Sequence, residues 1–140
     1  MKMKRLFTYI LVALFFVSCG VPDDTIDFYH EFMPVDSVEI PEELHVNETY
    51  QIVMSYTRPS DCYVFSDIYY VYESPFERTV SIICKVYNNN ENCDPLTYPA
   101  YDAIFNFTPT NTGTYVFNFW QGLDDNGENL FLTVEVPVTE

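Results

Sequence analysis

The feature of this sequence that most constrains its fold is a series of short runs in which apolar and polar side chains alternate. In residues 50–57, Ile52, Met54 and Tyr56 fall on one face of an extended chain, and Ser55 falls on the other. Successive side chains of a strand point to opposite faces, so each such run can bury one face. The runs that we expect to form strands are residues 37–40, 50–57, 62–72, 79–87, 101–107, 114–120 and 129–138.

Seven short strands separated by turn residues predict an all-β domain of two packed layers. The chain has 140 residues, which suits a single domain, and its hydrophobic content of 48% argues against disorder. No stretch keeps a helical period beyond two turns. We therefore expect an antiparallel β-sandwich of about seven strands over residues 35–140.

The first residues have the pattern of a signal peptide, which we assign to residues 1–18. Lys2, Lys4 and Arg5 form a positive start, and residues 6–17 are apolar apart from Thr8. This apolar segment is too short to span a bilayer as a stable helix and matches the core of a signal peptide.

The segment ends in Phe16-Val17-Ser18-Cys19-Gly20, which resembles the lipobox of bacterial lipoproteins. The resemblance implies that Cys19 is lipidated, becomes the new N-terminus and anchors the protein to the membrane. Phe16 departs from the usual leucine, so the match depends mainly on Ser18, Cys19 and the preceding residues. The alternative is an ordinary secretory signal with a chance cysteine.

Residues 19–34 are expected to form an acidic tether after the lipidated cysteine. Asp23, Asp24 and Asp27 resemble the acidic export signal of Bacteroidetes-type lipoproteins, which implies an outer-membrane, surface-exposed location. The alternative is a solvated linker whose acidic residues do not direct export.

The charge of the chain excludes one class of partner. Removal of the signal peptide leaves three basic residues against all 21 acidic residues, a net charge of −18. Such a surface is repelled by phosphate backbones, so we expect no nucleic-acid partner.

Residues 111–117, Asn-Thr-Gly-Thr-Tyr-Val-Phe, resemble the entry to strand F of immunoglobulin-like domains. That resemblance implies an immunoglobulin-like sandwich and a structural tyrosine corner at Tyr115, whose hydroxyl would bond nearby backbone. Phe117 stands where those domains carry a cysteine. Residues 40–50 resemble the opening of many bacterial immunoglobulin-like repeats, and residues 58–65 and 113–122 resemble small Bacteroidetes-type surface lipoproteins, a family that implies fold and location but no activity.

Three cysteines remain after Cys19 is assigned. Cys84 shares a face with Val80 and Ile82, where a free cysteine acts as a small core residue. Cys62 and Cys93 both lie beside turn residues, and we favour a Cys62–Cys93 disulfide over a Cys84–Cys93 bridge. No Cys-x-x-Cys occurs and neither histidine is near, so we predict no metal site there.

Signals for other chemistry are weak. Residues 124–129, Asp-Asp-Asn-Gly-Glu-Asn, suit a hard cation such as calcium, but the EF-hand spacing fails and Asn126-Gly127 is typical of a tight turn. No nucleophile motif or phosphate-binding loop is present. We therefore predict a protein that is not an enzyme and needs no cofactor.

Tyrosines are concentrated in one expected strand, where Tyr63, Tyr69, Tyr70 and Tyr72 occupy both faces. Some of these rings must be exposed unless another element covers them, and exposed rings beside polar groups can stack on sugars. The alternative is that tyrosine simply suits strands. We expect a non-catalytic interaction or accessory module that binds another surface protein, or alternatively a glycan-binding module.

The lipobox yields the first testable prediction. Replacing the anchoring cysteine (Cys19→Ser) should abolish partitioning into the membrane and leave the domain folded, because the acyl chains supply the membrane affinity. Fractionation after a salt wash measures this. A variant that still sediments with the outer membrane would show that anchoring does not depend on Cys19.

Overall fold

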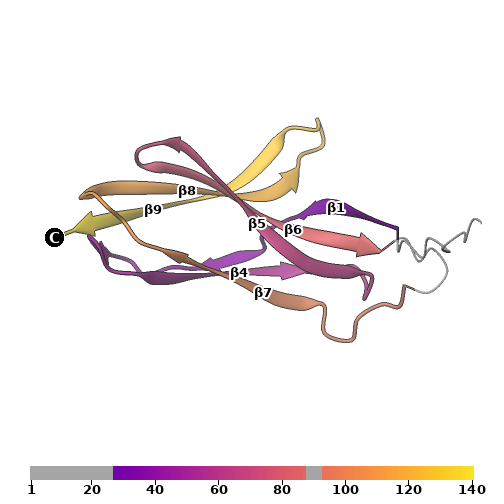
Figure 1. Cartoon of the computed structure of the whole chain (residues 1–140). Helices are drawn as coiled ribbons and strands as arrows, with labels where there is room; N and C mark the ends of the chain where they lie inside the picture. Colours follow the sequence, from indigo (N-terminus) through magenta and orange to yellow (C-terminus); the bar gives the residue numbers. More distant parts are fainter. Residues whose placement is uncertain (1–26, 88–92) are drawn as a thin grey trace, which may run out of the picture.

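The computed structural model describes residues 27–87 and 93–140 and contains only strands as regular elements there (Figure 1). In chain order they are β1 (Phe28–Met33), β2 (Ser37–Glu39), β3 (Leu44–His45), β4 (Tyr50–Thr57), β5 (Tyr63–Ser74), β6 (Glu77–Tyr87), β7 (Ala100–Phe107), β8 (Gly113–Leu123) and β9 (Asn129–Thr139). The signal peptide, Cys19 and the tether before residue 27 lie outside the described residues. Within the described ranges, no helix is long and apolar enough to cross a membrane.

The strands form two sheets that pack face to face, so the predicted all-β sandwich is confirmed. The larger sheet has the order β1-β6-β8-β9-β3, and β5 also pairs with β6. The smaller sheet has the order β2-β4-β7. All seven expected strands are present, with bounds close to those that the alternation predicts.

The core lies between the sheets and is built from the inward-facing half of each alternating run. Ile52 and Met54 of β4 are fully buried against residues of β6 and β8 such as Ile82 and Phe117. Phe107 of β7 joins the layers, since its ring centroid lies 5.0 Å from that of Phe117 in an edge-to-face contact. The alternation of apolar and polar residues therefore marks the buried face of each strand, as predicted.

Strand β6 holds the larger sheet together. It pairs with β5 along one edge, and on the other edge it pairs with β1 over residues 82–87 and with β8 over residues 77–80. A strand with neighbours on both edges has few unpaired backbone groups, which stabilises the middle of the sheet.

Two pairings correct the expectation of a purely antiparallel sandwich, because β6–β8 and β3–β9 are parallel. Between β6 and β8 the chain crosses to the smaller sheet and forms β7, so it re-enters the larger sheet in the same direction as β6. An immunoglobulin-like domain has two antiparallel sheets, and the parallel β6–β8 pair departs from that pattern.

The folded domain begins earlier than residue 35. Strand β1 lies within the segment that the sequence analysis assigned to the tether, and it pairs with β6 from Phe28↔Tyr87 to Met33↔Ile82. Met33 is buried in the core. The described sandwich therefore starts at Phe28 and not at residue 35, as the sequence alone suggests.

The predicted disulfide is confirmed. Cys62 and Cys93 are bonded, with their Cα atoms 5.4 Å apart and a sequence separation of 31, and Cys84 is free and buried. Backbone hydrogen bonds reinforce this end of the sandwich, since Asp61 N–H donates to Asp94 O over 3.1 Å. Burial raises the pKa of the Cys84 thiol, which keeps it protonated and unreactive.

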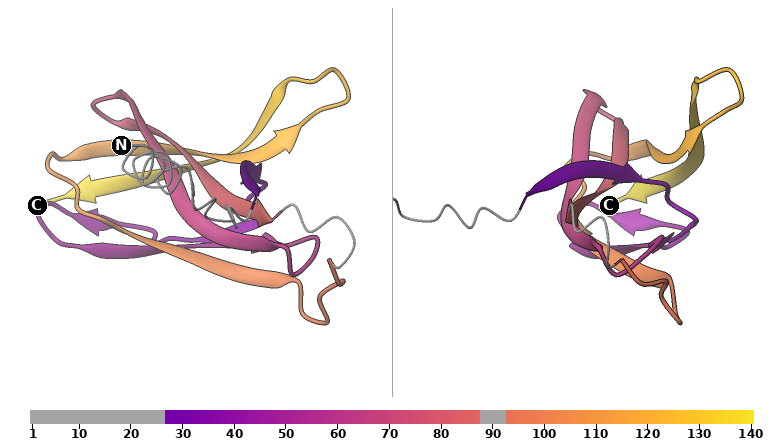
Figure 2. Two further views of the ribbon diagram at one scale, coloured as in Figure 1. Left: turned by 45° about the vertical axis from the view of Figure 1, so that its right-hand side comes forward. Right: turned by 90° about the vertical axis from the view of Figure 1, so that its right-hand side faces the viewer.

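Two hairpins rise from the larger sheet on the side away from the smaller sheet (Figures 1 and 2). One is the β5–β6 hairpin and the other is the β8–β9 hairpin, and they diverge from each other in all three views. The outer face of the larger sheet between them is not covered by another element of the described chain.

The disulfide gives a stability prediction with an internal control. Cys62→Ser combined with Cys93→Ser should lower the free energy of unfolding by about 3–4 kcal/mol, because the open chain regains the entropy of a 31-residue loop. Cys84→Ala leaves a small cavity and should cost only about 1 kcal/mol. Denaturant unfolding followed by circular dichroism measures both. Equal losses in the two variants would contradict the role of the disulfide.

Candidate functional site

A hollow of about 350 Å³ lies on the outer face of the larger sheet, and we call it the aromatic cup. Its floor is formed by Thr79 and Ser81 of β6. Its lining residues are Phe32 of β1, Tyr69 and Glu73 of β5, Thr79 and Ser81 of β6, Trp120 of β8, and Asn129 and Phe131 of β9. Residues far apart in the sequence therefore meet here because the sheet brings five strands together.

Strand register explains why these side chains share one face. Tyr69 lies directly opposite Ser81 across the β5–β6 ladder, and Trp120 lies opposite Phe131 across the β8–β9 ladder. Directly opposite residues of a sheet point to the same side. Val80 and Ile82, the neighbours of Ser81 on β6, point the other way and are fully buried in the core.

Phe32 reaches the cup because the chain after β1 is bonded to β8. Val35 N–H donates to Trp120 O over 2.9 Å, and the Gln121 side-chain amide donates to Val35 O over 3.1 Å. The ladder has a register shift between Trp120 and Gly122, and Gly122 has a φ of +106°, which favours glycine. This bulge accommodates Gln121 where it can reach the segment after β1.

The rings of the cup stand at steep angles to one another. The centroid of Phe32 lies 5.4 Å from that of Tyr69 with an interplanar angle of 82°, and 6.0 Å from that of Trp120 with an angle of 61°. Phe32, Tyr69 and Phe131 are 45%, 42% and 42% exposed. The Trp120 indole N–H donates to Asn129 Oδ1 over 2.8 Å, which holds that ring in place.

The polar groups of the cup are few. The Ser81 hydroxyl is buried and has no hydrogen-bond partner among the described residues. Thr79 adds a second hydroxyl to the floor, and Glu73 adds an exposed carboxylate at the rim. No lysine or arginine of the described residues lines the cup. The result is a set of aromatic walls with one anionic group beside them.

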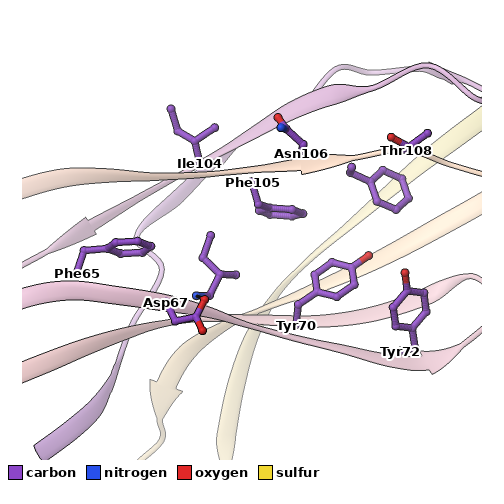
Figure 3. A pocket seen from close by; sticks show the side chains of 10 residues that line it. Phe65, Asp67, Tyr70, Tyr72, Ile104, Phe105, Asn106 and Thr108 are labelled. Carbon is purple, nitrogen blue, oxygen red and sulfur yellow. Dashed lines mark hydrogen bonds between the residues drawn. The ribbon is translucent and has the colours of Figure 1, made fainter.

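A second hollow, of about 640 Å³, opens between β5 and β7, which are edge strands of the two sheets; we call it the edge groove (Figure 3). Phe105 points from β7 toward β5, whereas Ile104 and Asn106 point away from it (Figure 3). The Phe105 ring contacts that of Tyr70 at 5.7 Å between centroids. The groove is an opening to the core and is lined partly by core side chains.

The four tyrosines that the sequence singled out are separated by the structure. Only Tyr69 lines the cup. Tyr70 and Tyr72 line the edge groove, and Tyr63 donates a hydrogen bond to a Glu31 carboxylate oxygen over 3.3 Å. Burial is the main cause that raises the pKa of Tyr63, to about 12.

Tyr70 and Tyr72 are both engaged by the buried Arg78. The Arg78 guanidinium donates to the Tyr70 hydroxyl over 3.0 Å, and its central carbon lies 4.0 Å from the Tyr72 ring centroid. It also donates to the backbone oxygens of Ser74, Pro75 and Glu77, which closes the β5–β6 hairpin. Both tyrosines therefore contact the protein's own Arg78 side chain.

The residues of the cup that sequence reasoning missed are Phe32, Glu73, Thr79, Ser81, Trp120 and Phe131. Trp120 and Ser81 both follow the alternation of their strands onto the outer face, and that position is the signal that could have identified them. Phe32 lies in β1, which the sequence analysis did not treat as a strand. Because the cup combines residues from several strands, a cluster of tyrosines within one strand could not reveal it.

Tyr115 is buried, as expected for a structural residue, but its surroundings are aromatic. Its ring meets Phe76 at 5.2 Å and Phe107 at 5.3 Å, measured between centroids. A Cβ added at Gly113 would lie 3.0 Å from the Phe76 ring. The absence of a side chain at Gly113 therefore allows Phe76 to pack over Tyr115. Among the described residues, no hydrogen bond that joins the Tyr115 hydroxyl to backbone is found, so the tyrosine corner stays a prediction.

The acidic loop between β8 and β9 is closed by its own side chain. Asp124 Oδ1 accepts hydrogen bonds from the backbone N–H groups of Asn126 and Glu128, at 2.8 and 2.9 Å. These bonds lower the pKa of Asp124. Gly127 has a φ of +81°, but Asn126 has no positive φ and Leu123 pairs with Asn129, so the loop is longer than the two-residue turn that Asn126-Gly127 predicts.

Asp61 lies close to Cys62 and Cys93, but this group is structural. The two sulfur atoms are bonded to each other, and Asp61 Oδ1 accepts a hydrogen bond from Asp94 N–H over 2.9 Å. The cysteines are therefore not free to act as thiolate ligands.

The buried hydroxyl of the cup yields a stability prediction. An unpartnered buried polar group costs about 1–3 kcal/mol, so Ser81→Ala should leave the free energy of unfolding unchanged or raise it by up to about 1 kcal/mol. Ser55→Ala is the control, because Ser55 donates to Asp102 over 2.7 Å and its loss should destabilise slightly. Urea unfolding compares them. A Ser81 variant that loses as much stability as the control would mean that its hydroxyl is bonded.

Comparison of the chain with protein families, with curated proteins and with solved structures finds no match. The function of this protein is therefore inferred from the geometry of its own residues, and the aromatic cup is the feature of that geometry with the clearest chemical character.

Proposed function

We propose that this protein is a lipid-anchored surface protein that acts by binding, and that the outer face of its larger sheet is the binding face. The observation that carries the proposal is the aromatic cup, in which four partly exposed rings surround a hollow with an unpartnered buried hydroxyl. Exposed aromatic groups of this density favour recognition, because burying them on binding is strongly favourable.

The placement of the cup suits a tethered module. Strand β1 starts at Phe28, opposite Tyr87 at the end of β6, and the Tyr87 N–H donates to Cys62 O over 3.1 Å. The tether therefore leaves the domain at the disulfide end. An anchor at Cys19 would hold that end toward the membrane and leave the side of the domain, where the cup lies, open to partners.

The lining of the cup suits binding better than catalysis. It contains one carboxylate and two small hydroxyls, and neither histidine is part of it. The Ser81 hydroxyl has no base beside it among the described residues that could activate it. We therefore propose an interaction or accessory role at the bacterial outer surface, in the manner of the small lipoproteins that the sequence resembles.

A glycan is the second candidate ligand, and one observation favours it. The rings stand beside Thr79, Asn129 and Glu73, and sugars are bound by aromatic faces combined with hydroxyl, amide and carboxylate groups. In this case the module would present polysaccharide to degradation or uptake machinery. Of the tyrosines first considered for this role, Tyr69 alone is in position.

Photo-cross-linking on intact cells tests the binding face without knowledge of the partner. A diazirine amino acid at Val71, which lies between Tyr69 and Glu73 on β5, should capture a partner, because that position borders the cup. The same group at Ile104, which is 51% exposed on β7, should capture much less. Adduct mass on gels and by mass spectrometry measures this. Capture at Ile104 and not at Val71 would move the binding face to the smaller sheet and contradict the proposal.

A further inference from the structure

The basic residues of the described chain share an unusual position, since each stands over an aromatic ring. The guanidinium carbon of Arg58 lies 4.5 Å from the centroid of Tyr101, and Lys85 Nζ lies 4.9 Å from that of Phe28. Arg78 stands over Tyr72 in the same way. These distances are within the range of about 6 Å over which a cation is attracted to a ring face.

The aromatic cup is the exception. It gathers four rings and the Glu73 carboxylate, but none of the three described cations lies over Phe32, Tyr69, Trp120 or Phe131. Elsewhere in this protein a cation lies over one or two aromatic rings. The cup has four rings and a carboxylate, and no described cation of the protein lies over them.

We infer that the aromatic cup binds the quaternary ammonium group of a small organic cation. This inference rests on the proposed function, because it names the class of ligand for the binding face proposed above. The surrounding surface adds long-range attraction, since the chain without its signal peptide carries a net charge of −18 and draws cations toward it.

The angles between the rings favour a compact cation over a sugar. Phe32 stands at 82° to Tyr69 and at 61° to Trp120, so the rings form walls that meet at a corner. Such walls can face a rounded charge from several sides. A pyranose ring is a puckered chair that stacks one face of C–H groups on a single aromatic face, whereas the rings of this corner are steeply inclined to one another.

The shortage of acceptors favours a quaternary over a primary ammonium. A primary ammonium carries three N–H donors, each of which loses its water on burial. The acceptors of the cup are the Glu73 carboxylate and the hydroxyls of Tyr69, Thr79 and Ser81, and Asn129 Oδ1 already accepts a hydrogen bond from Trp120. A quaternary ammonium has no N–H donor that needs an acceptor, and its methyl groups can pack against the rings.

The lining also excludes anions. Within residues 27–87 and 93–140, no basic side chain lines the cup, and Glu73 would repel a phosphate or carboxylate. A zwitterion such as a phosphocholine group can bind only with its anionic part directed out of the cup, away from Glu73.

The single tryptophan makes this inference directly measurable, because Trp120 lies in the cup and the chain has no other. The lipidated full chain is purified in a polyoxyethylene detergent, since maltoside or phosphocholine headgroups would compete. Tetramethylammonium and choline are titrated, and each should produce a saturable change in Trp120 fluorescence. The neutral isostere 3,3-dimethylbutan-1-ol, which has the shape of choline without its charge, should bind at least about tenfold more weakly.

Variants assign the effect to the cup. Glu73→Gln should weaken choline binding several-fold because it removes the rim charge, and Phe32→Leu should weaken it by about tenfold because it removes one wall. Tyr98→Leu is the matched control, since Tyr98 is exposed and outside the cup, and it should leave affinity unchanged. Circular dichroism confirms that each variant is folded.

Glycerophosphocholine distinguishes the source of the ammonium group. Tighter binding of glycerophosphocholine than of choline would support a lipid headgroup as the source, and weaker binding would support a free small cation. Both results keep the inference, because the trimethylammonium group is common to the two probes.

Three outcomes would overturn the inference. They are equal binding of choline and its neutral isostere, saturable binding of neutral monosaccharides with none of choline, and no change with any ammonium probe in a folded protein. In each case the cross-linking result at Val71 stands separately. Capture there would keep the outer face as the binding face and reject only the cationic ligand.

Discussion

The structure depends on the pairing of strand β6. This strand is bonded to β5 on one edge and to β1 and β8, placed end to end, on the other. Its inward side chains, Val80, Ile82 and Cys84, are fully buried in the core. Because alternate residues of β6 point outward, the same strand that fills the core also supplies Thr79 and Ser81 to the floor of the aromatic cup. One face of β6 therefore packs in the core, and its other face forms part of the candidate site.

The distribution of charge follows a second constraint. With few basic residues available, the protein uses each described one over a ring, and Arg78 is also bonded to three backbone oxygens at the β5–β6 turn. A cation so placed is stabilised by hydrogen bonds and ring faces without a carboxylate beside it. The remaining surface stays strongly acidic. None of the described lysine or arginine side chains lies over the rings of the cup, so these rings are free to attract an external cation.

Much of the fold could be predicted from the sequence, because the alternation of apolar and polar residues directly reports which side of a strand is buried. The pairing of Cys62 with Cys93 followed from their positions beside turns. Strand β1 was missed because residues 28–33 carry aromatic side chains on both faces and follow an acidic segment. The parallel β6–β8 pair was missed because pairing direction depends on the path of the chain through β7, which no local pattern encodes.

The candidate site was predictable only in part. Tyr69 was identified, but its neighbour Tyr70 points to the opposite side of β5 and is engaged by Arg78. The cup needs Phe32, Trp120 and Phe131 from three other strands, and their meeting depends on sheet order and on the contact between Val35 and Trp120. Properties that arise from strand order in space cannot be recovered from neighbouring residues in the sequence.

The central claim is that the outer face of the larger sheet binds a cation within the aromatic cup. A crystal structure of the protein grown with saturating tetramethylammonium tests it most directly. We expect density for the cation among Phe32, Tyr69 and Trp120, with its nitrogen within about 6 Å of the ring centroids. An empty cup with the cation bound in the edge groove, between β5 and β7, would contradict it.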